Sequence, residues 1–355
     1  MSSIPTVAKA WRYPPTQPSA WNAYHSLELQ DVQVPAPGRG EVLVKMRAVA
    51  LNNRRGIYPI PGFTTGPDGK GLIPTSDGAG DIVAVGEGVD GWVVGDRVHS
   101  LLSQGWIDGP IKAEYMSTFL GSKVQGCLTQ YRIFPAEFIL PVPDHLSYEE
   151  SASAICVGIT AFNALFATES ITPDSTLLVL GSGGLSVIGA QLAKAAGARV
   201  IATTSSKEKV QKYKALGVDH VINHREVPNW ADEVKRVTDG QGVDHVIEIG
   251  GKGTLAEAVK SIKLNGVVHV MSASRDEAPA TALFDLAVAL IFSRGKINGI
   301  SPGGKDVAQR LDSFISKHKL KPSFDSKVFR WEEAREAYDY FQSGAHFGKV
   351  VIRID

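Results

Sequence analysis

Cysteine and net charge are both scarce in this sequence. Its 355 residues include only two cysteines, Cys127 and Cys156, and 37 basic residues balance 37 acidic ones. Two thiols cannot build a disulfide framework or a four-cysteine zinc site, and they favour a reduced, cytoplasmic compartment. A net charge of zero gives no reason to expect nucleic acid or an anionic membrane as a partner.

A secretory signal and a membrane-spanning run are also lacking. The N-terminal residues MSSIPTVAKAWRYPP contain no apolar core of a signal peptide, and no uninterrupted apolar run reaches bilayer length. Hydrophobic residues make up 43% of the chain and charged residues 21%, as in soluble globular proteins. The length is enough for two domains.

The most informative pattern lies between residues 176 and 200. An apolar strand-like run ends at the glycine-rich segment GSGGLS, a helical pattern follows, and a second strand-like run begins at Arg199. Such a turn binds a dinucleotide pyrophosphate through glycine backbone and the N–H groups of the following helix. The alternative is an ordinary strand-to-helix turn. The predicted cofactor-binding residues of this turn are Gly181, Ser182, Gly183, Gly184 and Leu185.

The end of the second strand indicates which dinucleotide is bound. Sites for NAD place an acidic residue there, about 20 residues beyond the motif, to bond the ribose hydroxyls. This chain has Thr204, Ser205 and Ser206, followed by Lys209, and Glu208 already lies in the next helix. Hydroxyl and ammonium groups suit a 2′-phosphate, so we expect NADP(H). Alternatively, Ser205 or Ser206 caps the helix, which is compatible with phosphate binding.

The rhythm of the chain predicts an α/β fold with a β-rich domain and a doubly wound parallel sheet. Residues 1–150 show many short strands and turns, including a hairpin of 81–85 with 92–98 and a turn at Gly95-Asp96, and residues 52–74 are irregular. Helices separate six predicted strands, at 177–180, 200–204, 220–223, 243–249, 266–272 and 297–301. We expect domains at 1–150 and 151–302, with residues 303–355 returning to the first domain.

The chain resembles the medium-chain dehydrogenases and reductases, the superfamily of zinc alcohol dehydrogenases and quinone oxidoreductases. The resemblance runs nearly end to end. It implies a GroES-like domain and a six-stranded Rossmann domain with the active site between them. The segments that carry it are DGAG at 77–80, VGEGV at 85–89, VGDRV at 94–98, GSGG at 181–184, ALGVDHVIN at 215–223, GVDHV at 242–246 and HFGKVV at 346–351.

The metal ligands of the zinc members are not matched. Asn52 and Asn53 stand at the position of the first cysteine, and Ser76 stands at that of the histidine. Only Cys156 falls on a ligand position, whereas a catalytic zinc needs three protein ligands. The resemblance therefore implies a zinc-free reductase with no metal site, in which Cys156 is a small buried residue near the cofactor.

Zinc-free relatives carry an Asn-Tyr-Arg-Asp segment where this chain has Asn52-Asn53-Arg54-Arg55. We predict two catalytic residues: Asn52, whose amide donates to a substrate oxygen, and Tyr58, whose phenol supplies a proton. Alternatively, Asn52 caps a turn and Tyr58 packs under the loop. The resemblance also implies contacts of Ser206 and Lys209 with the 2′-phosphate. Further implied cofactor contacts are Thr160, His224, Ile249, Gly250 and Ser272.

Together these features predict an NADP(H)-dependent, metal-independent reductase of quinones, enones or related activated carbonyl compounds. The alternatives are a zinc-type alcohol dehydrogenase and a catalytically idle NADPH-binding protein. The sixth strand, residues 296–301, should lie at a sheet edge. It has apolar residues and no proline, so we expect a homodimer formed by pairing this edge with its copy.

Overall fold

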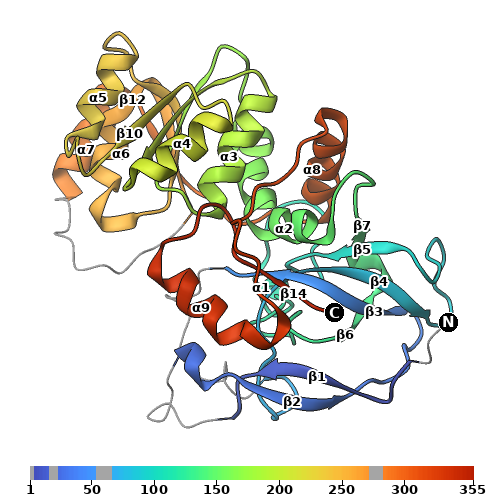
Figure 1. The fold of residues 1–355 in the computed structure, drawn as a ribbon. Helices are drawn as coiled ribbons and strands as arrows, with labels where there is room; N and C mark the ends of the chain where they lie inside the picture. The colour runs from blue at the N-terminus through green and yellow to red at the C-terminus, as the bar shows by residue number, and fades with distance from the viewer. Residues whose placement is uncertain (1–3, 16–22, 53–65, 272–282) are drawn as a thin grey trace. The chain divides into compact units, whose positions relative to one another are not determined.

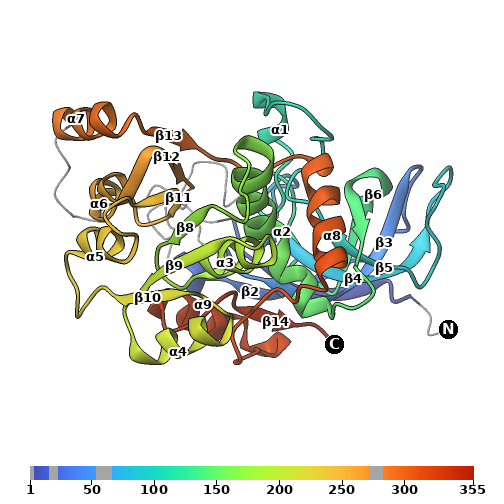
Figure 2. The ribbon, with the colours of Figure 1, turned by 90° about the horizontal axis from the view of Figure 1, so that it is seen from above.

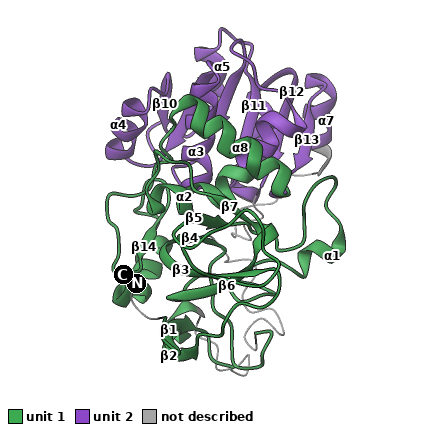
Figure 3. Ribbon diagram, turned by 90° about the vertical axis from the view of Figure 1, so that its right-hand side faces the viewer, with its two compact units in different colours: residues 1–159, 303–355 green, residues 160–302 purple. Residues whose placement is uncertain are grey.

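The computed structural model describes residues 4–15, 23–52, 66–271 and 283–355, and it divides the chain into two units (Figures 1 and 3). Unit 1 comprises residues 1–159 and 303–355, and unit 2 comprises residues 160–302. The boundary lies inside helix α2 (Tyr148–Phe162), after Ile159, rather than at residue 150. Unit 1 is therefore built from two separated stretches of the chain.

Unit 2 is a parallel six-stranded sheet in the order β10–β9–β8–β11–β12–β13. In sequence order this is 3-2-1-4-5-6, so the predicted doubly wound topology is confirmed. The strands are β8 (Thr176–Val179), β9 (Arg199–Thr204), β10 (His220–Asn223), β11 (Val243–Glu248), β12 (Ile262–Val270) and β13 (Lys296–Gly299). The helices between them are α3 (Gly184–Ala195), α4 (Lys207–Ala215), α5 (Trp230–Val237), α6 (Leu255–Ser261) and α7 (Leu283–Ser293).

Both faces of this sheet are covered, which explains why its strands are apolar throughout rather than alternating. Leu177, Leu178 and Val179 in β8 are completely buried. Helices α5, α6 and α7 contribute to the core on one face. On the other face, Gly189 of α3 approaches so closely that an added Cβ would lie 2.4 Å from Cδ1 of Ile247. This contact holds α3, which begins at the glycine-rich turn, against the sheet.

The larger sheet of unit 1 has the order β14–β3–β4–β5–β7, with β6 also paired to β3. A separate antiparallel pair, β1 (Val7–Arg12) with β2 (Glu28–Gln33), completes its strands. The strands of the larger sheet are β3 (Glu41–Ala50), β4 (Asp77–Val85), β5 (Arg97–Ser100), β6 (Tyr131–Pro135), β7 (Ile139–Pro141) and β14 (Val351–Arg353). Because Ala50 pairs with both Asp77 and Val351, the end of β3 lies beside the start of β4 and of β14.

Besides α2, the described part of unit 1 contains one short helix in a long loop and two helices in its C-terminal segment. These are α1 (Ala113–Met116), α8 (Lys305–His318) and α9 (Ala334–Ser343), the last preceded by a 3₁₀ turn at Trp331–Glu333. Figure 2 shows α8 beside α2, and residues of both helices line the same small cavity. The return of residues 303–355 thus supplies two helices, a strand and part of the core of unit 1.

The predicted hairpin is wrong over residues 92–94, because the second strand begins only at Arg97, after the predicted turn at Gly95-Asp96. The carboxylate of Asp96 accepts a hydrogen bond from the N–H of Val93 at 2.8 Å, and Gly95 has a φ of 100°. These contacts form a turn, so Val93 and Val94 are 64% and 54% exposed although their apolar character suggests a strand. Most of the irregular segment 52–74 lies outside the described residues.

Helix α2 continues into a π-helical turn at Asn163–Thr168. Among the described residues, Tyr148–Thr168 is one helical stretch long and apolar enough to cross a membrane, with a mean hydropathy of 1.5. About two thirds of it, 67%, is buried inside the protein, as in the core helix of a globular protein. It is therefore weak evidence for a membrane location.

Candidate functional site

A buried lysine organises the end of β3 in unit 1. Lys349, just before β14, donates to the carbonyl oxygen of Leu51 at 2.6 Å and to Oδ1 of Asn52 at 2.7 Å. Its Nζ is also 3.1 Å from Oδ2 of Asp77, at the start of β4. The side chains of Lys349 and Asp77 are only 3% and 0% exposed. A buried charge pair of this kind is maintained only when hydrogen bonds satisfy its remaining groups.

A second route of hydrogen bonds joins the same groups. Nδ2 of Asn52 donates to Oγ of Ser76 at 3.3 Å, and Ser76 Oγ donates to Oδ1 of Asp77 at 2.7 Å. Lys349, Asn52, Ser76 and Asp77 therefore form a closed ring, which we call the Lys349 ring. The backbone N–H of Cys156 also donates to Oδ2 of Asp77, at 3.2 Å. This N–H fixes the carboxylate from outside the ring.

The backbone leading into the ring is strained at Thr75. This residue has a φ of 67°, which is unfavourable for a β-branched side chain. Its carbonyl accepts a hydrogen bond from the N–H of Cys127 at 2.9 Å. A Cβ on Gly126 would lie 2.2 Å from the carbonyl oxygens of Pro74 and Thr75, so glycine is needed at this position. Strain held in place by surrounding contacts is frequent at functional sites.

Cys127 lies next to Ser76 of the ring, but its thiol is unreactive. Its thiol is completely buried, and burial raises the pKa of Cys127 to about 12. Its Sγ lies 3.5 Å from the carbonyl oxygen of Ser76, which also accepts from Ser100 Oγ at 2.7 Å. Cys127 therefore acts as a packing residue and hydrogen-bond donor, because only a thiolate is a good nucleophile or ligand.

In unit 2 the predicted glycine-rich turn has the geometry that a pyrophosphate needs. Gly181 has a φ of 71°, and no heavy atom lies within 4 Å of the place where a Cβ on Gly183 would stand. Helix α3 begins at the next residue, and its N-cap, Gly183, makes no side-chain hydrogen bond, as suits a helix start that binds an anion through backbone N–H groups. Ser186, at the third position of the motif, is buried and donates to the carbonyl oxygen of Leu180 at 2.6 Å. A dinucleotide fits this turn.

At the end of β9, Ser206 caps the next helix, which was the alternative to binding of a 2′-phosphate and is compatible with it. Oγ of Ser206 accepts from the backbone N–H of Lys209 at 3.2 Å, at the start of α4. Ser205 is half-buried, Thr204 is completely buried, and Lys209 is 8% exposed. His224, the first residue after β10, donates its backbone N–H to the carbonyl oxygen of Thr204 at 3.0 Å. Burial, together with Arg225, lowers the pKa of His224, which disfavours its cationic form.

The remaining predicted cofactor residues lie in a helix and in a turn. Thr160, inside α2, is 6% exposed, whereas Ile249 and Gly250 follow β11 and are half-buried. Tyr58 and Ser272 lie outside the described residues. The structure therefore brings together the glycine-rich turn and the β9 end in unit 2, and Asn52 with its partners in unit 1.

Glu248, the last residue of β11, was missed by the sequence analysis. Its Oε1 accepts from the N–H groups of Gly250 and Gly251 at 2.6 and 2.8 Å, and from Oγ1 of Thr254 at 2.7 Å. Burial raises the pKa of Glu248 although these hydrogen bonds favour the ionised carboxylate. The side chain shapes the turn that carries the predicted residues Ile249 and Gly250. An acidic residue at the end of a strand was the available signal.

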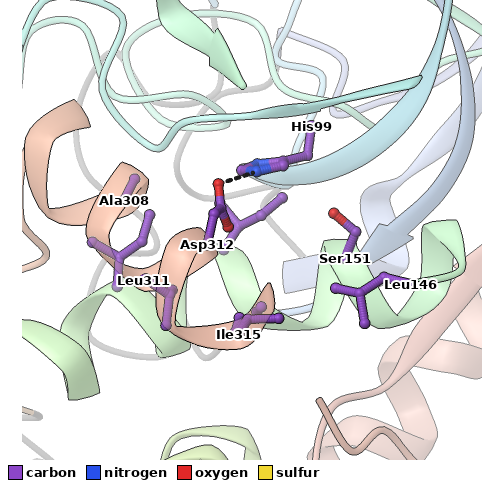
Figure 4. A pocket seen from close by; sticks show the side chains of 10 residues that line it. His99, Leu146, Ser151, Ala308, Leu311, Asp312 and Ile315 are labelled. Carbon is purple, nitrogen blue, oxygen red and sulfur yellow. Dashed lines mark hydrogen bonds and ion pairs between the residues drawn. The ribbon is translucent and has the colours of Figure 1, made fainter. Parts of the chain in front are cut away.

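A separate cavity in unit 1 contains the ion pair of His99 and Asp312 (Figure 4). The lining is otherwise mostly apolar and includes Ile155 of α2 and Ile315 of α8. The cavity volume of about 10 Å³ has room for one water molecule and none for a substrate. We therefore assign this cavity a structural rather than a catalytic role.

Comparison with known proteins identifies the family. A model described as the alcohol dehydrogenase GroES-like domain matches residues 38–144, and one described as zinc-binding dehydrogenase matches residues 184–317. A zinc-type alcohol dehydrogenase-like protein of Schizosaccharomyces pombe is 35% identical over 342 residues, or 94% of this chain and 97% of that protein. The chain belongs to the medium-chain dehydrogenase/reductase superfamily. It is therefore an oxidoreductase with GroES-like and Rossmann domains, as the resemblance implied.

Solved structures agree with this membership in the medium-chain dehydrogenases and reductases. The crystal structure of a putative alcohol dehydrogenase of Sinorhizobium meliloti superposes with a TM-score of 0.88, at 30% identity, and covers 99% of this chain and all of that one. An NAD-dependent alcohol dehydrogenase has a TM-score of 0.82 at 28% identity, with 98% and 100% of the two chains covered. These similarities support a nicotinamide dinucleotide as the cofactor.

Two further members have reductase names. A 2-methylene-furan-3-one reductase of Solanum lycopersicum is 28% identical and covers 99% of this chain and 80% of that protein. A 2-octenoyl-CoA carboxylase reductase, solved with NADP and 2-octenoyl-CoA, has a TM-score of 0.84 at 25% identity, covering 99% and 88%. The superfamily around this chain thus includes users of both NAD and NADP.

The name of the zinc-binding dehydrogenase model raises the question of a metal, and the residues that the structure describes do not fit one. Ser76 is hydrogen-bonded to Asp77, whose carboxylate is already bound by the ammonium of Lys349. No group of three or more His, Cys, Asp or Glu residues is placed to hold a metal within the ranges the structure describes. A cation next to Lys349 would be repelled by the ammonium at short range.

The roles of Asp77 and Lys349 were not foreseen in the sequence, although both lie in segments that carry the family resemblance. The available signal was a lysine in an otherwise apolar C-terminal strand pattern. Its partners Asn52 and Asp77 are 297 and 272 positions away, so only the sheet register identifies them.

Proposed function

We propose that this protein is an NADP(H)-dependent, metal-independent oxidoreductase that transfers hydride to quinones, enones or related activated carbonyl compounds. The observation that carries the proposal is the Lys349 ring. It places an ammonium–carboxylate pair, rather than metal ligands, beside a partly exposed amide of Asn52. The 2-methylene-furan-3-one reductase among the similar proteins supports the substrate class.

The proposed division of labour follows from chemistry. The reduced nicotinamide, when bound, supplies the hydride for a carbonyl or conjugated alkene. The glycine-rich turn with Gly181 and Gly183 binds the pyrophosphate through backbone N–H groups. Asn52 donates an amide N–H to the substrate oxygen, which becomes more negative as hydride arrives, so the hydrogen bond strengthens in the transition state. Tyr58, outside the described residues, is proposed as the proton source.

The preference for NADP(H) is supported by the residues after β9. Ser205 and Ser206 offer hydroxyls, the first turn of α4 offers N–H groups, and Lys209 offers a cation. The chain has no acidic side chain at positions 204–207 that would bond ribose hydroxyls and repel a phosphate. Because the superfamily also includes an NAD-dependent alcohol dehydrogenase, the preference is tested by measuring the affinities for NADPH and NADH.

The experiment is steady-state oxidation of NADPH by the purified protein with a panel of quinones, enones and simple aldehydes. We expect turnover with the conjugated compounds and little with unactivated aldehydes. Tight NADPH binding with no turnover of any panel member contradicts the proposal and favours an idle cofactor-binding protein. Turnover of simple alcohols that depends on added zinc favours the alcohol dehydrogenase alternative.

We also propose a cytoplasmic homodimer that pairs through β13. This strand is bonded to β12 on one side, and no other described strand pairs with it. Large apolar side chains are exposed on neighbouring elements of unit 2, with Ile291 and Phe292 of α7 at 72% and 78% and Leu264 of β12 at 66%. A second copy would cover apolar surface and satisfy the free edge of β13 together.

A further inference from the structure

The Lys349 ring leaves only one arrangement of hydrogen-bond donors and acceptors. An ammonium has three N–H donors and no acceptor, and Lys349 meets three acceptors: the Leu51 carbonyl, Asn52 Oδ1 and Asp77 Oδ2. The amide atom of Asn52 that faces Lys349 must therefore be its oxygen. The nitrogen then faces the other way.

The opposite side of the ring gives the same answer independently. Ser76 has a single hydroxyl proton, and it donates that proton to Oδ1 of Asp77 at 2.7 Å. Toward Asn52 the hydroxyl can only accept, so the atom facing it must be a donor, Nδ2. Flipping the amide would set two donors against each other at Lys349 and two acceptors against each other at Ser76. The ring thus specifies the amide orientation from both ends.

We infer that Lys349 is a positioning residue that fixes and polarises the Asn52 amide for the substrate oxygen, an inference that rests on the proposed function. Nδ2 carries two protons and the ring uses one. Among the described residues none accepts the other, and the side chain is partly exposed. The ammonium of Lys349, which donates to the amide oxygen of Asn52, draws electron density from the amide nitrogen and strengthens its remaining N–H as a donor.

Lys349 itself is not available to the substrate, because its three N–H groups are used within the protein and its side chain is 3% exposed. Its effect must pass through Asn52. The backbone supports the same arrangement, since the N–H of Leu51 donates to the carbonyl oxygen of Val350 at 2.9 Å. The lysine and the residue it orients are therefore held by the same pair of strands.

The test removes both charges of the pair, because Lys349→Met alone strands the buried carboxylate of Asp77 and endangers folding. The paired variant Lys349→Met/Asp77→Asn leaves no uncompensated charge. Arg353→Met is the matched control, since it removes the ion pair of Arg353 with Glu149 from the same C-terminal strand, away from Asn52. Lys349→Arg keeps the charge but loses the three-point geometry, and it replaces the paired variant if that variant does not fold.

The first readout needs no substrate. In protein labelled with ¹⁵N-asparagine, the Asn52 side-chain amide is identified by its loss in Asn52→Asp. We expect its hydrogen exchange to accelerate about tenfold or more when Lys349 no longer holds the oxygen, with no change in Arg353→Met. Unchanged exchange in the folded variant overturns the inference, whether or not a substrate has been found.

The second readout is a double-mutant cycle with Asn52→Ala on an accepted enone. We expect the paired variant to lower kcat about tenfold or more, with little change in KM, and to cause no further loss in the Asn52→Ala background. Equal losses in both backgrounds mean a merely structural pair and overturn the inference while the proposed function stands. A wild-type protein without turnover refutes the proposed function instead, and the exchange measurement then decides on Lys349 alone.

Discussion

The buried His99 on β5 forms an ion pair with the partly buried Asp312 on α8, with 3.0 Å between the imidazole Nε2 and the carboxylate Oδ2. The other ring nitrogen, Nδ1, lies 3.0 Å from the carbonyl oxygen of Ser100. Both neighbours are acceptors, so only a protonated imidazole donates to both. The pair ties the returning C-terminal segment of unit 1 to the sheet formed by its N-terminal segment.

This pair predicts a pH-dependent stability. Burial by itself lowers the pKa of His99, but the charge and hydrogen bond of Asp312 and the Ser100 carbonyl outweigh it and raise the pKa. A raised pKa in the folded protein gives stability that is present in full below the ordinary value of about 6.5 and is lost as pH rises through the folded value. We expect the free energy of unfolding of unit 1 to fall with rising pH in this window, and the slope to flatten in His99→Gln.

The measurement is denaturant unfolding of the wild type and His99→Gln at several pH values from about 5.5 upward. The variant His145→Gln is a control, because that imidazole bonds the backbone carbonyl oxygen of Leu320 and forms no ion pair with a carboxylate within the described ranges. Asp312→Asn should lower stability by about 1–3 kcal/mol at low pH, where the buried imidazolium loses its counter-charge, and by less at higher pH, where the imidazole can deprotonate. Identical pH slopes in wild type and His99→Gln contradict the prediction.

Cofactor selectivity is the second prediction. We expect NADPH to bind about tenfold or more tightly than NADH. Lys209→Ala should weaken the binding of NADPH by about 1.5–3 kcal/mol and hardly change the binding of NADH. Lys212→Ala, on the same helix and paired with Glu208, is the matched control. Fluorescence titration of both cofactors checks this, together with a melting temperature because Lys209 is largely buried. Equal affinities of the wild type for the two cofactors contradict it.

Metal independence is the third prediction. Elemental analysis of the purified protein should find no stoichiometric zinc, and a chelator should not reduce activity, because Lys349 neutralises Asp77 where a metal would need its own ligands. A variant that restores ligand types, Ser76→His, should still bind zinc poorly while Lys349 is present. About one zinc per chain in the wild type, with activity lost on chelation, refutes this account.

Assembly is the fourth prediction. Successive N–H groups of a strand point to opposite sides, and the N–H of Ile300 donates to the carbonyl oxygen of Val270, on the β12 side, at 2.9 Å. Ile297→Pro therefore removes a donor on the free side of β13, whereas Ile300→Pro removes one that faces β12. Light scattering should report a dimer for the wild type and a smaller mass for Ile297→Pro. Ile300→Pro shows how much of any change comes from damage to unit 2 itself. A wild type that is monomeric at micromolar concentration rules the β13 dimer out.

The Rossmann unit was predictable because its signals are local. Each parallel strand is a short apolar run, and the turn GSGG lies between one such run and a helix pattern, so topology rules fix the order 3-2-1-4-5-6. The strand prediction was wrong at 92–94, because Val93 and Val94 look like strand residues, whereas they belong to the turn that Gly95 and Asp96 form and are exposed there. The apolar character of Val93 and Val94 therefore did not predict correctly whether they are buried.

The chemistry of unit 1 was predictable only in part. Asn52 was identified from the resemblance, but the groups that orient it were not, because Lys349 and Asp77 meet through pairing of β14 and β4 with β3. His99 lacked an expected role for the same reason, since Asp312 lies 213 positions further along the chain. Contacts at such separations depend on sheet register, which a single sequence specifies only weakly.

The split of unit 1 into two stretches has a consequence for the order in which the protein is made. A ribosome reaches Lys349 297 residues after Asn52. At about 5–20 residues per second, roughly 15–60 s pass between the synthesis of Asn52 and that of Lys349. Residues 160–302 form unit 2 from one continuous stretch and are complete before residue 349 is added. Unit 2 can therefore fold on the ribosome, whereas the carboxylate of Asp77 stays hydrated until the last strand arrives.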